Sequence, residues 1–196
     1  LMRASIRRRA AYVDIARWTQ RLKPAVMEAV ALAPSAPVVF ASSWMAGVPG
    51  LFAAHLAKQV THIDRIEMSI LFALKDKAGP NSVEYADQLG VGIDVLEDGI
   101  WKTVGSMSDP RDVTFSGARR LRTRRFATPD LEILPRVTGA RSVGVRITYD
   151  DPGAGGVMAF LVRSGLWKAI SGPRFEGLRR SMIYHPGPGD AHEVVI

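Results

Sequence analysis

The chain has 196 residues, of which 47% are hydrophobic, so it can bury the substantial core of a globular protein. It contains no cysteine, which excludes disulfides, thiolate nucleophiles and cysteine-ligated metal sites. No apolar run approaches the ~20 residues of a membrane-spanning helix, and the amino end lacks the apolar centre of a signal sequence. We therefore expect a cytoplasmic protein without a membrane partner.

The net charge of +7 arises mainly from arginines clustered at 7–9, 119–125 and 179–180. Basic proteins attract phosphates, so nucleic-acid binding is one function to weigh. A strand over the second cluster would place Arg120, Arg122 and Arg124 on one face. Because only Phe126 supplies a ring for base stacking there, we favour a solvated strand face or a contact with an acidic partner over a nucleic-acid site.

In chain order, the first predicted elements form a strand–helix–strand–turn–helix unit. Tyr12-Val13-Asp14 ends a strand, and apolar side chains then recur with a helical period over residues 17–33. Val38-Val39-Phe40 is a short apolar run typical of a buried parallel strand. Pro49 has the fixed φ that suits the first turn of a helix, which we expect over 49–60.

The turn after the second strand carries Ser42, Ser43, Trp44, Gly47 and Gly50. Open α/β sheets usually present their ligand-contacting groups at the carboxyl ends of the strands. We therefore predict that this turn faces a substrate or cofactor, with Ser42, Ser43 and Trp44 as the foremost contacts.

Asp14 and His55 complete the candidate set. Asp14, at a strand end, could accept a hydrogen bond from a ligand or cap the following helix, and the sequence supports both equally. His55 could face the cleft as an acid, base or donor, although a histidine on a helix face is more often structural. The four histidines lack zinc-ligand spacing, so we expect no metal site, and the catalytic residues stay unknown.

Downstream, the pattern predicts a long strand over 66–74 with one buried face, and then a break and a helix capped by Asn81 or Ser82. The later predicted elements are strands at 100–104, 113–115 and 142–149, a helix from an N-cap at Thr128 to about Val137, a largely buried helix over 155–170, and a strand at the carboxyl end.

The stretch Asp151-Pro-Gly-Ala-Gly-Gly156 follows a strand and opens a helix, as phosphate-binding loops do. A G-x-G-x-x-G pattern laid from Gly153 places Met158 where the last glycine is needed for close packing. The favoured interpretation is a flexible turn whose N–H groups face solvent or an anion.

Two segments carry a family resemblance. Tyr12-Val13-Asp14 and Gly47-Val48-Pro49-Gly50-Leu51 match, in order and spacing, the Y-V-D strand end and the G-x-P-G-L turn of the saccharopine dehydrogenase-like oxidoreductases, which the chain resembles. Phe115-Ser-Gly117, Arg124-Arg-Phe126 and Thr128-Pro-Asp-Leu131 extend the resemblance more loosely. Val48 stands where the saccharopine reductase branch commonly has an aspartate, which argues against saccharopine as the substrate.

The resemblance implies NAD(P)-dependent oxidoreduction at a substrate amine or hydroxyl. No G-x-G-x-x-G precedes Tyr12, so we expect a carboxy-terminal fragment or a natural truncation, in which little of the nucleotide-binding half is present. Residues 1–46 are then a remnant of that half, and 47–196 form a substrate and dimerisation domain. The expected fold is α/β to α+β: a remnant of a parallel Rossmann-type sheet, then a mixed or antiparallel sheet covered by helices.

The predicted function is accordingly that of the substrate and dimerisation domain of a saccharopine dehydrogenase-like oxidoreductase. We expect a homodimer, an unidentified small-molecule substrate, and no tight binding of NAD(P) by this chain alone. Two alternatives stay open: a non-catalytic dimerisation or partner-binding module, and a basic nucleic-acid-binding protein.

Overall fold

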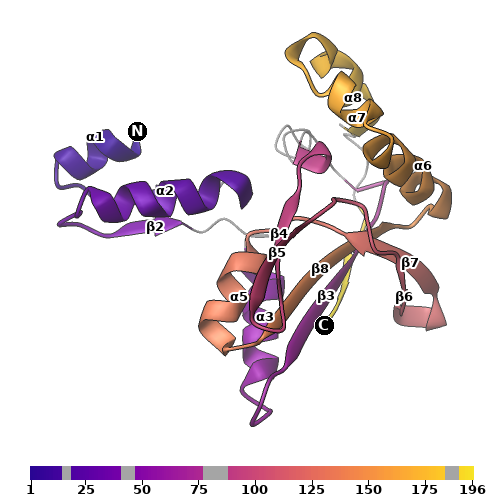
Figure 1. Cartoon of the computed structure of the whole chain (residues 1–196), viewed down its shortest axis with the longest axis horizontal. Helices are drawn as coiled ribbons and strands as arrows, with labels where there is room; N and C mark the ends of the chain where they lie inside the picture. The colour runs from indigo at the N-terminus through magenta and orange to yellow at the C-terminus, as the bar shows by residue number, and fades with distance from the viewer. Residues whose placement is uncertain (15–18, 41–46, 77–87, 184–189) are drawn as a thin grey trace.

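The computed structural model describes residues 1–14, 19–40, 47–76, 88–183 and 190–196. The protein is a mixed α/β structure with a small parallel sheet, a larger mixed sheet and helices (Figure 1). The predicted contacts Ser42, Ser43 and Trp44 lie outside the described residues, as does the start of the helix expected after Asn81.

The first four elements form the amino-terminal unit, which stands beside the larger body in Figure 1: α1 (Met2–Arg7), β1 (Tyr12–Asp14), α2 (Thr19–Ala31) and β2 (Val38–Phe40). Strands β1 and β2 are parallel, with Tyr12 opposite Val38. Its core consists of Met2, Ile6 and Ala29. The predicted strand–helix–strand order is confirmed, and α1 is an addition to it.

Seven strands form the larger sheet: β3 (Arg65–Phe72), β4 (Ile93–Glu97), β5 (Ile100–Val104), β6 (Arg111–Thr114), β7 (Arg120–Arg125), β8 (Ser142–Tyr149) and β9 (Glu193–Val195). Their order is β5-β4-β8-β3-β9, and β7 joins β8 to β6. Strands β3 and β8 are parallel, and the other pairs are antiparallel. Both β4 and β7 pair with β8, at Val143 and at 146–147 respectively.

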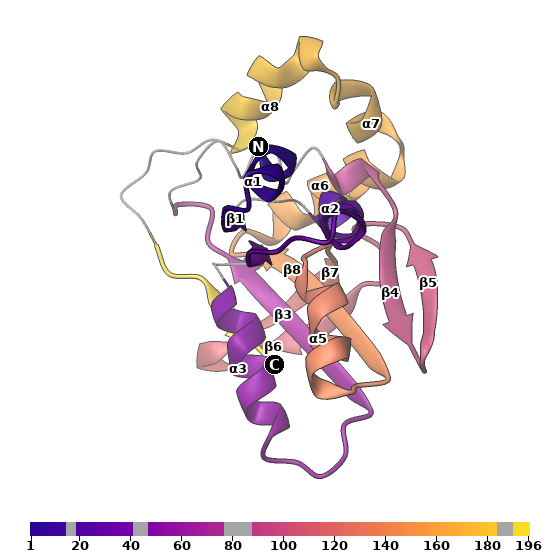
Figure 2. The same ribbon diagram turned by 90° about the vertical axis from the view of Figure 1, so that its left-hand side faces the viewer.

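The α-helices of the larger body are α3 (Val48–Ala57), α5 (Asp130–Thr138), α6 (Pro152–Arg163), α7 (Leu166–Ile170) and α8 (Glu176–Ile183). Short 3₁₀ turns are η2 (Gln88–Gly90), η3 (Ser116–Ala118) and η4 (Pro173–Phe175). Helices α3 and α5 lie along one face of the sheet, and α6, α7 and α8 extend from one end of it (Figure 2).

Much of the core lies between the sheet and helices α3 and α5, and Ala159 of α6 and Trp167 of α7 extend it. Strand β3 contributes Ile66, Met68 and Ile70, and β8 contributes the side chains opposite them in register, Val143, Val145 and Ile147. Burying an aliphatic side chain of this size stabilises the fold by about 1.5–3 kcal/mol. This face therefore fixes the register of the two parallel strands.

Three predictions need correction. Strand β3 is buried on both faces in its second half, at Ser69 and Leu71 as well as Met68 and Ile70, because it is an inner strand with β8 and β9 on either side. The expected helix over 155–170 is two helices, separated at Gly165 with φ +80°, and its apolar side chains are not largely buried.

The third correction concerns the start of α5. Its N-cap is Pro129, and no side chain caps it. The backbone oxygen of Thr128 accepts from Leu131 N at 3.2 Å, whereas the buried Thr128 hydroxyl has no hydrogen-bond partner. A main-chain hydrogen bond thus stabilises the first turn of α5, where a bond from the Thr128 side chain was expected.

Within the ranges given above, no helix has both the length and the apolarity to span a bilayer. In the same ranges, no three His, Asp or Glu side chains are grouped closely enough to hold a metal ion.

Candidate functional site

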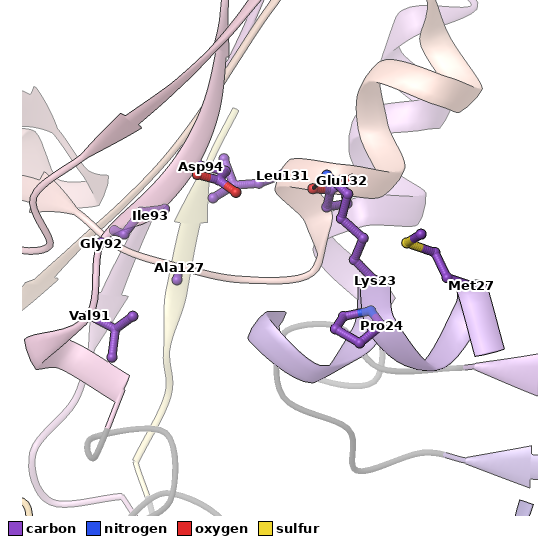
Figure 3. A pocket seen from close by; sticks show the side chains of 10 residues that line it. All are labelled: Lys23, Pro24, Met27, Val91, Gly92, Ile93, Asp94, Ala127, Leu131 and Glu132. Carbon is purple, nitrogen blue, oxygen red and sulfur yellow. Dashed lines mark ion pairs between the residues drawn. The ribbon is translucent and has the colours of Figure 1, made fainter.

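A pocket of about 610 Å³ lies where α2 of the amino-terminal unit faces β4 and α5 of the larger body (Figure 3). The residues that line it come from all three elements and the segments before β4 and α5: Lys23, Pro24, Met27, Val91, Gly92, Ile93, Asp94, Ala127, Leu131 and Glu132. Small-molecule sites are commonly of this size and often lie where two structural units meet.

The pocket combines an apolar lining with three charged side chains. Lys23 Nζ lies 4.0 Å from Glu132 Oε1 and 6.0 Å from the centre of the Trp101 ring. Asp94 Oδ1 accepts a hydrogen bond of 2.7 Å from Thr103 Oγ1. One ammonium and two carboxylates therefore border an apolar hollow, an arrangement that suits a small molecule with an apolar body and charged ends.

A tight hairpin places Asp94 at the pocket. Asp98 and Gly99 both have positive φ, +52° and +81°, as a two-residue type I′ turn between β4 and β5 requires. The turn sets Asp94 opposite Thr103. Along β4, Ile93 and Val95 are buried while Asp94 is exposed, so the alternation of the strand brings the carboxylate to the surface.

Gly47 and Gly50 have structural roles in this arrangement. Gly47 is the N-cap of α3 with φ +91°, a conformation that favours glycine. A Cβ atom at Gly50 would lie 2.5 Å from Oδ1 of Asp130, a side chain that is only 1% exposed. The two glycines therefore allow α3 to begin abruptly and to pack closely on α5, and neither lines the pocket.

The other described candidates also lie away from the pocket lining. The Tyr12 hydroxyl donates to Asp14 Oδ2 at 3.1 Å, within the amino-terminal unit. His55 is exposed on α3. The structure thus places Gly47, Gly50 and His55 along the start and length of one helix and Asp14 in the other unit, and it does not bring the four together.

Sequence reasoning missed Lys23, Asp94 and Glu132. A usable signal was present for Asp94, because Ile93-Asp-Val-Leu-Glu97 alternates and is followed by Asp98-Gly99, a strong hairpin pattern. Lys23 and Glu132 occupy ordinary helical positions, and only the approach of α2 to α5 brings them together.

The opposite face of the larger sheet carries an ionic network. Arg146, 1% exposed, binds Glu67 Oε2 through Nε at 3.3 Å and Asp109 Oδ2 through Nη2 at 2.5 Å. Arg125, 5% exposed, binds the same Asp109 oxygen at 3.0 Å and also Glu97. Because both buried guanidiniums are matched by carboxylates, the network holds the segment before β6 against the sheet.

The charges of this network shift the pKa values of its acids. Burial by itself raises the pKa of Asp109, but the hydrogen bond and charge of Arg146, with the charges of Arg111 and Arg125, outweigh it and lower that pKa below its usual range. For Glu97, burial likewise raises the pKa, and Arg125 together with Lys102 lowers it overall. Both carboxylates are thereby kept ionised at neutral pH.

The basic strand β7 shows the predicted alternation. Arg120 and Arg122 are exposed, and both bind Asp112 on β6, at 3.4 and 3.2 Å. Arg124, on the same face, is half-buried. Part of the positive charge on this face is therefore balanced within the sheet.

The start of α6 is occupied by its own cap. Asp151 Oδ1 accepts from Gly153 N at 2.7 Å and from Ala154 N at 3.4 Å. These N–H groups are bonded to the chain's own Asp151 carboxylate. They are therefore not left facing solvent or a bound anion, which corrects the favoured interpretation of the turn. A pyrophosphate would need the same groups and would be repelled by Asp151, so the residues here do not fit a dinucleotide.

No protein-family model matches the chain, and no curated protein matches it. The fold and the pocket therefore carry the functional argument.

Proposed function

We propose that the chain is the substrate and dimerisation domain of a saccharopine dehydrogenase-like, NAD(P)-dependent oxidoreductase. In this proposal the amino-terminal unit is a remnant of the nucleotide-binding domain and the larger body is the substrate domain. The observation that carries it is the pocket shared by α2 and by β4 and α5, because a substrate site between two such domains has to be lined by both.

The parallel pair β1–β2, connected through α2, supports this assignment, since a strand–helix–strand unit is the building block of dinucleotide-binding sheets. The nicotinamide group supplies hydride transfer in such enzymes. Asp151 caps the glycine-rich turn, so two of the N–H groups that a pyrophosphate would use are already bonded. In this proposal the chain contributes the substrate pocket and does not bind the dinucleotide tightly by itself.

The roles of the pocket residues follow from their charges. Lys23 would bind an acidic group of the substrate, and Asp94 and Glu132 would bind its amine. Pro24, Met27 and Leu131 would exclude water from the apolar part. The substrate would thus be a small molecule that carries an amine beside an acidic group.

Calorimetric titration with 6-aminohexanoate, which has an ammonium, a carboxylate and an apolar chain, tests the pocket, with hexanoate and hexylamine as single-charge comparators. Lys23→Gln is expected to weaken hexanoate by about fivefold, since one charge-assisted contact is lost, and to weaken 6-aminohexanoate as well. It should not weaken hexylamine, because Glu132 loses a competing ammonium group. Lys58→Gln, an exposed lysine at the end of α3, is the matched control.

The pocket assignment fails if the wild-type chain binds none of the three probes at millimolar concentration, or if Lys23→Gln and Lys58→Gln behave alike. The cofactor part has a separate test: fluorescence titration with NADH and NADPH should show no micromolar binding, and such binding would contradict it.

A non-catalytic dimerisation or partner-binding module is the second candidate. The observation that favours it is the exposed apolar side chains on α6 and α7, with Val157 59% exposed, Phe160 65% and Leu166 49%. Sedimentation equilibrium of the wild type and of Phe160→Ser distinguishes the candidates: a dimer that Phe160→Ser dissociates, combined with no response to 6-aminohexanoate, supports the second.

A further inference from the structure

The two carboxylates that border the pocket differ in what already binds them. Glu132 Oε1 lies 4.0 Å from Lys23 Nζ, and Glu132 Oε2 lies 3.5 Å from Nη2 of Arg136, one turn further along α5 (Figure 3). Asp94 accepts a hydrogen bond from the neutral hydroxyl of Thr103, and it makes no ion pair in the part of the chain that the structure describes. Asp94 is therefore the carboxylate whose charge a ligand can still balance.

The hairpin of β4 and β5 holds the Asp94 carboxylate in place. A Cβ atom at Gly92 would lie 2.8 Å from Cγ2 of Thr103, so a larger residue there would push Thr103 away. With glycine at this position, Thr103 Oγ1 reaches Oδ1 of Asp94 at 2.7 Å. Among the described residues, none donates a hydrogen bond to the other oxygen, Oδ2. One oxygen is thus held by the hairpin, and the second can accept a hydrogen bond from a ligand in the pocket that Asp94 lines.

Trp101 lies on the same face of this hairpin as Asp94. Thr103 is opposite Asp94 in register, and side chains two residues apart on a strand share a face, so Trp101 is a diagonal neighbour of Asp94. Trp101 is 44% exposed, and its ring centre lies 6.0 Å from Lys23 Nζ at the pocket. An aromatic face attracts a cation within about 6 Å of its centre. The ring is therefore accessible to an ammonium group that also reaches Asp94.

We propose that Asp94 and Trp101, here named the ammonium subsite, bind the amine of the pocket's ligand. Asp94 supplies the opposite charge, and the indole ring supplies a cation–π contact. The amine contact is thereby narrowed from two carboxylates to one, and Glu132 becomes a positioning residue that holds Lys23 for the ligand's acidic group. The assignment rests on the proposed function, since it takes this pocket to be the substrate pocket.

The ammonium subsite specifies which amines the pocket accepts. A carboxylate that binds by hydrogen bonds needs N–H donors on the amine, and full methylation removes them. An aromatic ring attracts the charge itself and binds quaternary ammonium groups well. A pocket with both groups should therefore accept an N-methylated amine, which a pocket with carboxylates alone would reject.

Calorimetric titration of the full chain with hexylamine and with hexyltrimethylammonium tests this assignment. Trp101→Leu should weaken both cations by about fivefold, since the cation–π contact is lost. Trp101→Phe keeps an aromatic ring and should recover part of that loss. Phe160→Leu, which removes an exposed ring from α6, is the matched control and should change either affinity by less than about twofold.

The carboxylate is tested in the same titrations. Asp94→Asn removes the charge but keeps an oxygen that can accept from Thr103, and it should weaken both cations by about tenfold. Asp64→Asn changes an acid whose side chain is 77% exposed just before β3, and should alter the affinities by less than about twofold. Because Asp94 and Trp101 are both exposed, their variants should keep the wild-type melting temperature.

Three results would overturn the assignment. The first is that the wild type binds neither cation at tens of millimolar. The second is that hexylamine binds while hexyltrimethylammonium does not, which would leave no role for the ring. The third is that Trp101→Leu behaves like Phe160→Leu, or Asp94→Asn like Asp64→Asn, which would show a response without a site.

The ammonium subsite and the proposed function fail in different ways. If both cations bind as expected but Lys23→Gln leaves hexanoate unchanged, the subsite stands and the proposed substrate, with its acidic group, is wrong. If Lys23→Gln weakens hexanoate but Trp101→Leu alters neither cation, the subsite is wrong and the proposed function stands.

Discussion

The amino-terminal unit and the larger body are built from the same kinds of elements but are stabilised very differently. The larger body has a described core of 17 buried apolar residues and the ionic network on the other face of its sheet. The amino-terminal unit has five buried apolar residues, three of which pack together as its own core, and an ion pair between Arg3 and Glu28 that is largely open to solvent. The comparison indicates that the larger body is the stable scaffold and that the smaller unit opens more easily, which matters because the pocket lies between them.

Truncating a core side chain should show the difference in stability between the two units most clearly. Met68→Ala removes a side chain with no solvent exposure and should lower the free energy of global unfolding by about 2–5 kcal/mol. Ile6→Ala, in the smaller core, should leave the main urea transition almost unchanged and speed hydrogen exchange only in residues 1–40. Equal shifts of the main transition in both variants would contradict the comparison.

Removing an arginine gives the next largest contrast. Arg146→Met leaves Glu67 without its buried partner and Asp109 with Arg125 as its remaining one. It should cost about 3 kcal/mol, the lower end for buried pairs because both carboxylates still reach water. Arg3→Met breaks an exposed pair and should cost less than about 1 kcal/mol. Urea unfolding of both variants measures the difference, and similar losses would mean that the network adds nothing beyond surface pairing.

Adding a methyl group should have opposite effects at two helical glycines. Gly50→Ala drives a Cβ atom into Asp130 and should destabilise the larger body by about 1–3 kcal/mol. Gly156→Ala, in α6, meets no atom within 4 Å and should stabilise by about 0.5–1 kcal/mol through helix propensity. Melting temperatures that move in the same direction would show that α3 and α5 are not packed as closely as described.

Acid should weaken the larger body through Asp109 and Glu97. Because their pKa values are lower in the folded protein than in the unfolded chain, their contribution is present above pH ~4 and is lost as the pH falls through the folded values. Unfolding free energy measured from neutral pH downward should therefore fall less steeply for Asp109→Asn than for the wild type. Identical slopes would exclude Asp109 from the acid response.

Burial of Tyr149 should make the larger body sensitive to alkaline pH. Burial raises its pKa to about 12, above the unfolded value of about 10. The neutral phenol is thus favoured by folding, and stability should decline as the pH rises from about 10 towards 12. The free energy of unfolding, measured by spectroscopy at several pH values between about 9 and 12, should therefore decline less for Tyr149→Phe than for the wild type. An equal decline in both would mean that other groups cause it.

Sequence periodicity predicted most elements, because each has a local signature. The apolar run at 38–40 and the alternation at 142–149 both correspond to strands. The hairpin partner β4 was missed despite the Asp98-Gly99 turn that follows it. The helix expected over 155–170 was predicted to be largely buried because it is apolar on most sides. Burial depends on what packs against it, and Phe160 is left exposed.

The candidate site was harder to predict. Gly47 and Gly50 were predicted to face a ligand, whereas the structure gives both a role in the backbone and packing of α3. Proximity to a ligand cannot be inferred from a turn alone. Lys23 and Glu132 are 109 residues apart and approach only because α2 faces α5 across the pocket. Such a pair has no local signature, and it becomes visible only when the tertiary arrangement is known.

The pocket between the two units is the central claim, and methyl NMR with 6-aminohexanoate tests it most directly. Met27 lies on α2 and Leu131 on α5, so a ligand in this pocket should shift the methyl signals of both, while Met68 in the sheet core stays unchanged. Shifts confined to one of the two units, or no shift at Met27 and Leu131 under saturating ligand, would contradict the account.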